Sequence, residues 1–182
     1  SISGNIIDFG ALESFNIEDT ISKVLQHDLN ERDYRVFERK LEEASSIVFF
    51  ADNAGEIVFD KVLVEELIKY NPGIKVIFVV RGFPIINDAT MEDAVFIGLN
   101  KIPNVIVEKF GSDELSVESL KMGLHDAENW VSNASFSISK GQGNYELFSG
   151  FRNTFFLLVA KCPVIARSLG VKVGDPVLKY FE

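Results

Sequence analysis

A carboxylate and an amide stand side by side directly after a run of strand-forming residues. Residues 49–60 read FFADNAGEIVFD, so Asp52 and Asn53 follow an apolar segment and precede a turn that contains Gly55. Carboxylate and amide oxygens are hard donors of the kind that Mg²⁺ and Mn²⁺ prefer. A structural interpretation is equally simple, because Asp and Asn start helices and Ala-Gly permits a tight turn. The pair alone leaves both interpretations open.

A second loop carries another pair of this kind. Residues 84–90 read PIINDAT, and Asn87 and Asp88 follow the next apolar segment of the chain. A third oxygen ligand from this loop would complete a protein face on a cation and leave positions for water and substrate. Together the two loops favour a metal site over two unrelated turns.

The third unusual loop reads KGQGN over residues 140–144. Gly141 and Gly143 let the backbone approach a ligand closely, and the amides that open a following helix favour anions, phosphate above all. The segment is neither a Walker A motif nor a dinucleotide fingerprint, because the glycine spacing of both is absent. The structural alternative is a glycine-rich turn in which Lys140 is solvated.

Alternating apolar segments and helical periodicities indicate the elements that hold these loops. We expect strands at 46–51, 75–80, 105–108, 136–139 and 155–160. We expect helices at 17–44, 59–70, 91–99 and 116–131, and another that opens in KGQGNYE. Strands alternating with helices predict an α/β protein with a three-layer, Rossmann-like fold and a mostly parallel sheet flanked by helices. No linker interrupts residues 1–182, so we expect a single domain.

The order of these elements gives the three loops a common location. Each loop leaves the carboxyl end of an expected strand, and ligands of open parallel sheets bind beyond those ends, where the strand order reverses. We therefore expect the three loops to meet at one site.

Composition limits the partners of that site. The chain carries 27 acidic and 18 basic residues, a net charge of −9, which argues against nucleic acid or an anionic membrane as the main partner. The single cysteine cannot form an internal disulfide, and the apolar run at 155–160 is far too short to span a membrane. We expect a cytoplasmic protein. Because the chain starts SISGNIIDFG without a Met, we also expect it to be the C-terminal portion of a longer polypeptide.

Five motifs, in order along the chain, resemble those of the damage-control phosphatase family, long catalogued as domain of unknown function 89, and in particular its archaeal and bacterial branch. The motifs are GNIIDFG (4–10), FADNAGE (50–56), PIINDATMEDA (84–94), SKGQGNYE (139–146) and AKCPVIA (160–166). The resemblance implies metal-dependent hydrolysis of phosphate monoesters, including sugar phosphates and damaged phospho-metabolites. It also implies a helical segment ahead of GNIIDFG in the same protein, which would cap the pocket and which the given chain lacks.

The resemblance also assigns residues. It places the metal on Asp52, Asn53 and Asp88 and a phosphate-binding lysine at Lys140. Asn5 and Asp8 match the family's GN-x-x-D element beside the substrate pocket. We accordingly expect Asp52, Asp88 and Lys140 to be catalytic and the cofactor to be Mn²⁺, Mg²⁺, Co²⁺ or Ni²⁺.

Backbone and neighbouring groups complete the expected phosphate site. These are Gly55, Glu56, Gly141, Gly143 and Asn144. Glu56 and Asn144 also have a structural interpretation, because acidic and amide side chains are common in the first turns of helices. Arg81 fits either a substrate contact or a surface ion pair, and either a metal-bound water or a carboxylate would be the nucleophile.

Two other classes of function stay open at this stage. One is a nucleotide- or cofactor-dependent transferase, which predicts tight cofactor binding without metal. The other is a non-catalytic domain that binds a small anion.

Overall fold

Six strands form one sheet within residues 29–182, the part of the chain that the computed structural model describes. The strands are β1 (Ser46–Phe50), β2 (Lys75–Arg81), β3 (Val105–Phe110), β4 (Phe136–Lys140), β5 (Thr154–Val159) and β6 (Pro176–Phe181). The helices are α2 (Glu31–Glu43), α3 (Ile57–Tyr70), α4 (Met91–Phe96), α5 (Val117–Asn133), α6 (Gln142–Phe148) and α7 (Pro163–Leu169), with a 3₁₀ turn η2 (Leu99–Lys101). Asn5 and Asp8 lie outside the described residues.

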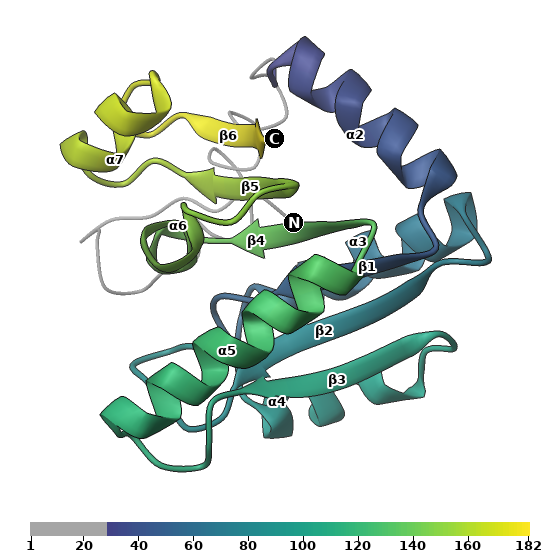
Figure 1. Ribbon diagram of the computed structural model, residues 1–182, viewed down its shortest axis with the longest axis vertical. Helices are drawn as coiled ribbons and strands as arrows, with labels where there is room; N and C mark the ends of the chain where they lie inside the picture. Colours follow the sequence, from purple (N-terminus) through teal and green to yellow (C-terminus); the bar gives the residue numbers. More distant parts are fainter. Residues whose placement is uncertain (1–28) are drawn as a thin grey trace.

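The strand order is β3-β2-β1-β4-β5-β6, and Figure 1 shows the strands in this sequence across the sheet. The first five are parallel to their neighbours, and β6 runs antiparallel to β5. The chain proceeds outward from β1 through β2 to β3 and then returns to place β4 on the other side of β1. The order therefore reverses between β1 and β4.

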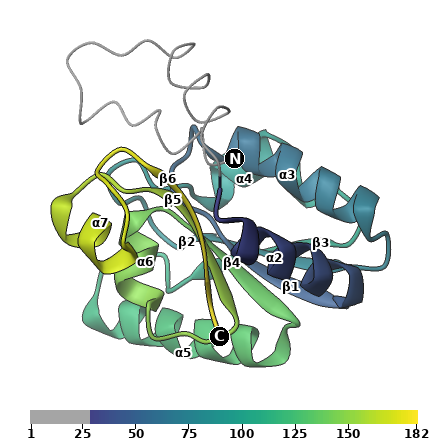
Figure 2. The same ribbon diagram turned by 90° about the horizontal axis from the view of Figure 1, so that it is seen from above.

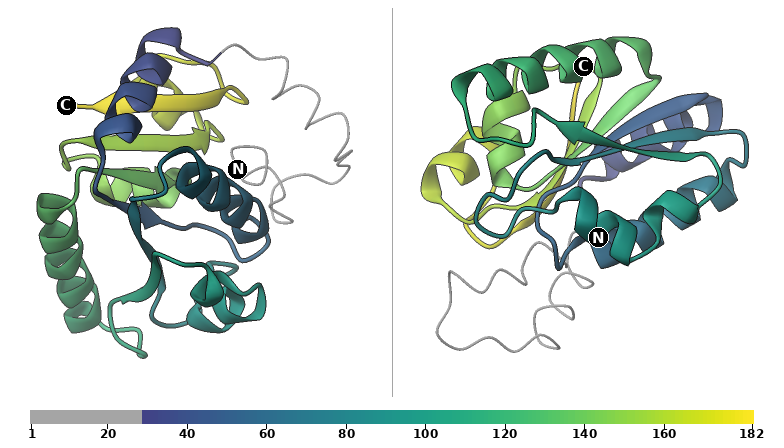
Figure 3. Two further views of the ribbon diagram at one scale, coloured as in Figure 1. Left: turned by 90° about the vertical axis from the view of Figure 1, so that its right-hand side faces the viewer. Right: turned by 90° about the horizontal axis from the view of Figure 1, so that it is seen from below.

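Helices cover both faces of the sheet, as Figures 2 and 3 show. Alternate residues of β1 divide between two cores: Ile47 and Phe49 pack with residues of α2, α3 and α4, whereas Val48 and Phe50 pack with residues of α5, α6 and α7. A strand buried on both faces must be apolar at consecutive positions, which is why β1 reads SIVFF. The prediction of a three-layer α/β fold with a mostly parallel sheet is confirmed.

Two predicted helices differ from the observed ones in the described residues. The predicted helix over 17–44 lies outside the described residues up to 28, and the described part is helical only over Glu31–Glu43, so the prediction is wrong at residues 29, 30 and 44. The Asn30 side chain accepts a hydrogen bond from the backbone N–H of Asp33 and so caps the helix. The predicted helix 91–99 ends at Phe96, since Gly98 adopts a left-handed φ of 78° before η2.

Two elements near the C-terminus were not predicted as such. The helix α7 has Pro163 at its first turn and ends at Gly170 in the left-handed conformation. The strand β6 pairs along the whole of β5, from Thr154↔Phe181 to Val159↔Pro176. No helix in the described part of the chain combines the length and apolarity needed to cross a membrane.

Candidate functional site

The loops that follow β1 and β2 are joined by their backbones. The N–H of Ala89 donates to the carbonyl of Asp52 at 2.7 Å, and the N–H of Ala54 donates to the carbonyl of Asn87 at 2.8 Å. Between these two bonds, Asn53 and Asp88 form an antiparallel β-bridge. The two pairs of oxygen-bearing residues found in the sequence therefore lie at one place, as predicted.

The loop after β4 joins them through a glycine. Gly141 has φ of 79°, and a Cβ built there would lie 1.9 Å from Oδ2 of Asp52. Only glycine leaves room for the Asp52 carboxylate at this point, and only glycine adopts such a backbone without strain. Because β1 and β4 are neighbours at the reversal of strand order, this contact lies where open α/β sheets bind ligands.

Asn144 ties the strand ends together. Its buried side-chain amide donates to the carbonyl of Ala51 at 2.8 Å and to the carbonyl of Lys140 at 2.9 Å. The prediction left open a ligand contact or a helix cap for this residue. The structure gives it a bracing role between β1 and β4.

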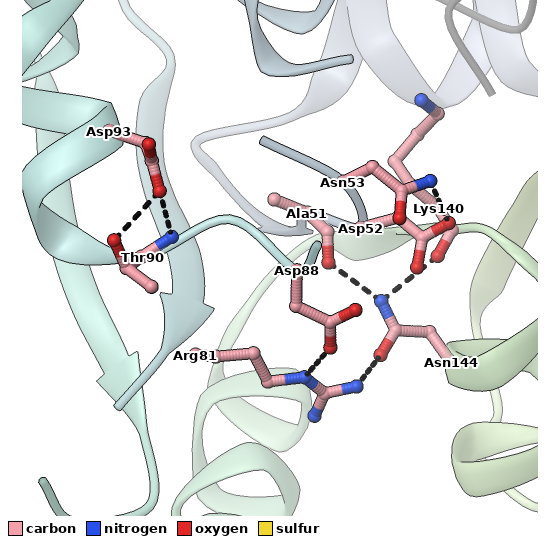
Figure 4. Close-up of polar contacts among 9 residues, drawn as sticks. All are labelled: Ala51, Asp52, Asn53, Arg81, Asp88, Thr90, Asp93, Lys140 and Asn144. Atoms are coloured by element: carbon pink, nitrogen blue, oxygen red, sulfur yellow. Dashed lines mark hydrogen bonds and ion pairs between the residues drawn. The ribbon is translucent and has the colours of Figure 1, made fainter. Parts of the chain in front are cut away.

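Arg81, at the end of β2, connects Asp88 to Asn144. Its Nε donates to Oδ2 of Asp88 at 2.7 Å, and its terminal nitrogen donates to Oδ1 of Asn144 at 3.0 Å. Figure 4 shows the guanidinium between these two side chains. The predicted surface ion pair is in fact mostly buried, with about a sixth of each side chain exposed (16% for Arg81 and 17% for Asp88). Arg81 thus fixes the orientation of a candidate metal ligand.

Lys140 is fully buried and faces two carboxylates. Its ammonium donates to Glu56 and, at 2.8 Å, to Oδ1 of Asp60. Burial alone opposes the charged ammonium, but the nearby carboxylates of Asp60 and Glu56 outweigh it and hold the pKa of Lys140 above its ordinary value. Lys140 is therefore a charged group inside the protein, not the solvated lysine of the structural alternative.

Glu56 and Asp60 are the acids of this cluster. Glu56 precedes α3, is 1% exposed and makes no capping hydrogen bond, so neither an exposed acid near the helix dipole nor a cap describes it. Asp60 was not predicted. Its signal in the sequence is its spacing, because residues four apart on a helix lie on one face.

The oxygen donors at the junction of the loops fit a hard divalent cation in their chemistry. Two carboxylates and one amide, those of Asp52, Asp88 and Asn53, come from adjacent loops, and the Asn53 amide donates to Oδ2 of Asp52 at 3.1 Å. Gly141 supplies the cradle in which the Asp52 carboxylate lies. Within residues 29–182 no cluster of three or more His, Cys, Asp or Glu side chains could hold a metal, so a site here depends on the amide.

The remaining predicted residues fall around this junction. Gly55 and Gly143 each have open space where a Cβ would stand, so neither is a glycine for lack of room. Thr90 is the N-cap of α4 and shares a capping box with Asp93, drawn in Figure 4, so its side chain is used in starting the helix. Gln142 was not predicted. Its Oε1 accepts the N–H of Lys161 at 2.6 Å and thereby links the KGQGN loop to the loop after β5.

Comparison with known proteins identifies the family. Residues 1–177 match the profile of the damage-control phosphatase ARMT1-like domain. The chain belongs to this family. The resemblance inferred from five motifs is thereby confirmed over almost the whole sequence.

Similar proteins come from archaea. A protein of Methanocaldococcus jannaschii is 39% identical over 189 residues, which cover 98% of this chain and 60% of that protein. A damage-control phosphatase of Pyrococcus horikoshii is 35% identical and one of Archaeoglobus fulgidus is also 35% identical, with 60% and 63% of their lengths covered. The crystal structure of the P. horikoshii protein, a DUF89 family member, superimposes with a TM-score of 0.79 at 34% identity.

The matches cover nearly all of this chain but only part of each relative. The P. horikoshii structure covers 100% of this chain, yet the chain covers 63% of that structure. The chain thus spans about three fifths of the length of the relatives that it matches.

Proposed function

We propose that this chain carries the site of a metal-dependent phosphatase that hydrolyses phosphate monoesters of small metabolites, such as sugar phosphates or damaged phospho-metabolites. The single observation that carries the proposal is the junction of the Asp52–Asn53, Asp88 and Gly141 loops at the reversal of strand order. Family membership supports the phosphatase chemistry.

In this proposal Asp52, Asn53 and Asp88 hold a divalent cation, Mn²⁺, Mg²⁺, Co²⁺ or Ni²⁺. When bound, such an ion offsets the charge of the phosphoryl group and lowers the pKa of water, which supplies a nucleophile. The chain's own contribution is to fix the donors beforehand. Arg81 orients Asp88, and Gly141 leaves room for the Asp52 carboxylate beside the backbone of the third loop.

The phosphate oxygens would be bound by backbone N–H groups near Gly55 and Gly143, with Asn144 holding the strand ends at a fixed separation. The predicted contribution of the Gly141 N–H does not fit, because that N–H donates to the carbonyl of Leu157 at 3.1 Å. Lys140 stays a predicted phosphate ligand. For a direct contact its ammonium must turn from Glu56 and Asp60. In the arrangement described here it neutralises charge beneath the loops instead.

The proposal also includes substrate contacts from the N-terminal residues, the cellular location and the kind of partner. Asn5 and Asp8 would border the substrate, and a helical segment ahead of them in the same protein would cap the pocket. We keep the expectation of a cytoplasmic protein, which came from its single cysteine, and of a small phosphate ester as its partner. The acidic composition is the basis for expecting neither nucleic acid nor membrane as a partner.

The test is hydrolysis of para-nitrophenyl phosphate with each of the four ions, with and without chelator. Activity should require metal, and Asp52→Asn and Asp88→Asn should each reduce kcat/KM by about 10²–10³-fold, the usual cost of losing one preorganised charge. Glu128→Gln, an exposed acid-to-amide change on α5, is the matched control and should leave the rate unchanged. Activity that survives chelation, or folded Asp52→Asn and Asp88→Asn variants with the parent rate, would overturn the proposal.

A further inference from the structure

An apolar pocket of about 470 Å³ adjoins the candidate site. Six apolar side chains line it, and they define what we call the apolar pocket: Phe83, Ile85, Phe110, Leu115, Val117 and Leu120. Arg81 is the charged residue among its walls, and Ser116 and Ser119 complete the lining. The volume lies within the range of small-molecule pockets, and an apolar lining with a single charged group is typical of them.

Several walls of the apolar pocket are open to solvent. Leu115 is 79% exposed, Val117 63% and Leu120 45%. Isolated exposed apolar residues are ordinary. A contiguous group around a hollow, however, stabilises a complex with an apolar partner, because binding removes apolar surface from water. The pocket therefore favours an apolar occupant.

The apolar pocket and the candidate site share residues and backbone. The guanidinium of Arg81 pairs with Asp88 at 2.7 Å and also lies 5.1 Å from the centre of the Phe110 ring. Phe83 and Ile85 belong to the same short loop as Asp88. Arg81 and Phe110 are register partners at the carboxyl ends of β2 and β3, the edge of the sheet where the three loops meet.

We propose that the apolar pocket binds the organic part of a phosphate monoester whose phosphate is held at the loop junction, and that this part is aromatic or branched aliphatic. The proposal rests on the proposed function. Against these walls a sugar would lose hydration of several hydroxyl groups and would find hydrogen-bonding side chains only in Arg81, Ser116 and Ser119, whereas an apolar group has no such hydration to lose. Arg81 stands between the two halves of the ligand, beside its charge and beside its ring.

Calorimetry with two phosphonates that cannot be hydrolysed tests this in the presence of saturating Mn²⁺. Methylphosphonate occupies the phosphate position alone, and 1-naphthylmethylphosphonate adds an apolar group. The naphthyl compound should bind at least about tenfold more tightly, because its ring leaves water for the apolar pocket. Equal dissociation constants for the two compounds would overturn the proposal.

A matched pair of variants tests whether the tighter binding of the naphthyl compound comes from the apolar pocket. Leu120 and Met122 are both on α5 and both 45% exposed, but only Leu120 lines the apolar pocket. Leu120→Lys should abolish the naphthyl advantage and leave methylphosphonate binding unchanged, whereas Met122→Lys should affect neither. Leu115→Lys, in the loop before α5, provides a second variant should Leu120→Lys unfold. Equal effects of Leu120→Lys and Met122→Lys would place the ring elsewhere and contradict the proposal.

The design separates this proposal from the one on which it rests. If methylphosphonate binds and Asp52→Asn reduces the affinity for both compounds equally, the phosphate site is supported. The difference in affinity between the two compounds then tests the apolar pocket alone. If neither compound binds, the proposed function fails and this proposal fails with it. Two results would assign the pocket to protein instead: a dimer that Leu120→Lys dissociates, or an advantage that vanishes in a polypeptide extended to the relatives' length.

Discussion

The ammonium of Lys140 balances two buried carboxylates beneath the candidate site. Lys140, Glu56 and Asp60 lie at the end of β4 and the start of α3, and none of the three side chains reaches solvent. Removing one partner of such a cluster is costly, because the charge that remains has lost both water and its counter-ion. The cluster can therefore be tested through stability, independently of catalysis.

Replacing Lys140 by Met should lower the free energy of unfolding by about 3–5 kcal/mol, the usual cost of breaking a buried ion pair. Urea denaturation of the two proteins measures the difference. Lys69→Met is the matched control, since the Lys69 side chain is 76% exposed and should contribute little. Adding Asp60→Asn to Lys140→Met should restore part of the loss, and strictly additive losses would contradict a direct interaction.

The same cluster sets a pH dependence. Because the folded protein holds the pKa of Lys140 above its unfolded value, the stability it contributes is complete below the unfolded pKa and disappears only as pH rises through the folded pKa. The stability difference between the parent and Lys140→Met should therefore not fall as pH rises from about 7 to about 9, and it should shrink only in stronger alkali. A difference that disappears near neutral pH would mean that the buried lysine is not charged.

At the scale of elements, Gly141 allows the loop after β4 to lie against the loop after β1. Gly141→Ala puts a methyl group against the Asp52 carboxylate at a φ of 79°, so the carboxylate or the loop must move. We expect a loss of about 1–3 kcal/mol and a fall in any phosphatase activity. Gly143→Ala, two residues on and inside α6, meets no atom within 4 Å and should be neutral or slightly stabilising. Urea denaturation of both variants measures the contrast, and equal effects would remove the steric explanation.

Much of the element order could be predicted because strands buried on both faces are continuous apolar runs. The segment KVIFVVR, for example, is β2, and its first six residues could be predicted as a strand without any tertiary information. α7 was missed because it has only seven residues and begins shortly after an apolar strand, although Pro163 at its first turn and Gly170 after its last residue were available signals. The early start predicted for α2 failed because the helical pattern continues through Asn30, which caps instead.

The meeting of the loops was also predictable, since it follows from parallel strands and a reversal of their order. What could not be predicted is how the side chains pair. The sequence does not determine whether Lys140 turns toward an open loop or toward Glu56 and Asp60, because that depends on rotamers and on burial set by distant elements. The link from Arg81 to both Asp88 and Asn144 joins residues 63 positions apart and has no local pattern.

At the scale of the whole molecule, the candidate metal ligands come from segments that enter different parts of the sheet. Asp52 and Asn53 end β1, Asp88 precedes α4, and Gly141 brings the end of β4 against Asp52. A ligand that binds all of these groups at once stabilises the fold as a whole, because unfolding separates them. Global stability is therefore a measure of cation binding that does not require turnover.

Saturating Mn²⁺ should raise the free energy of unfolding by about 2.7 kcal/mol when the free ion is 100-fold above its dissociation constant. Thermal or urea denaturation with and without the ion measures this. Asp52→Asn should lose most of the increase, since the amide keeps the shape of the carboxylate but not its charge, and Glu128→Gln should retain it. Should Asp52→Asn gain as much from Mn²⁺ as the parent chain, the ion must bind elsewhere. Because the readout is folding, this result would hold even for a chain that turns over no substrate by itself.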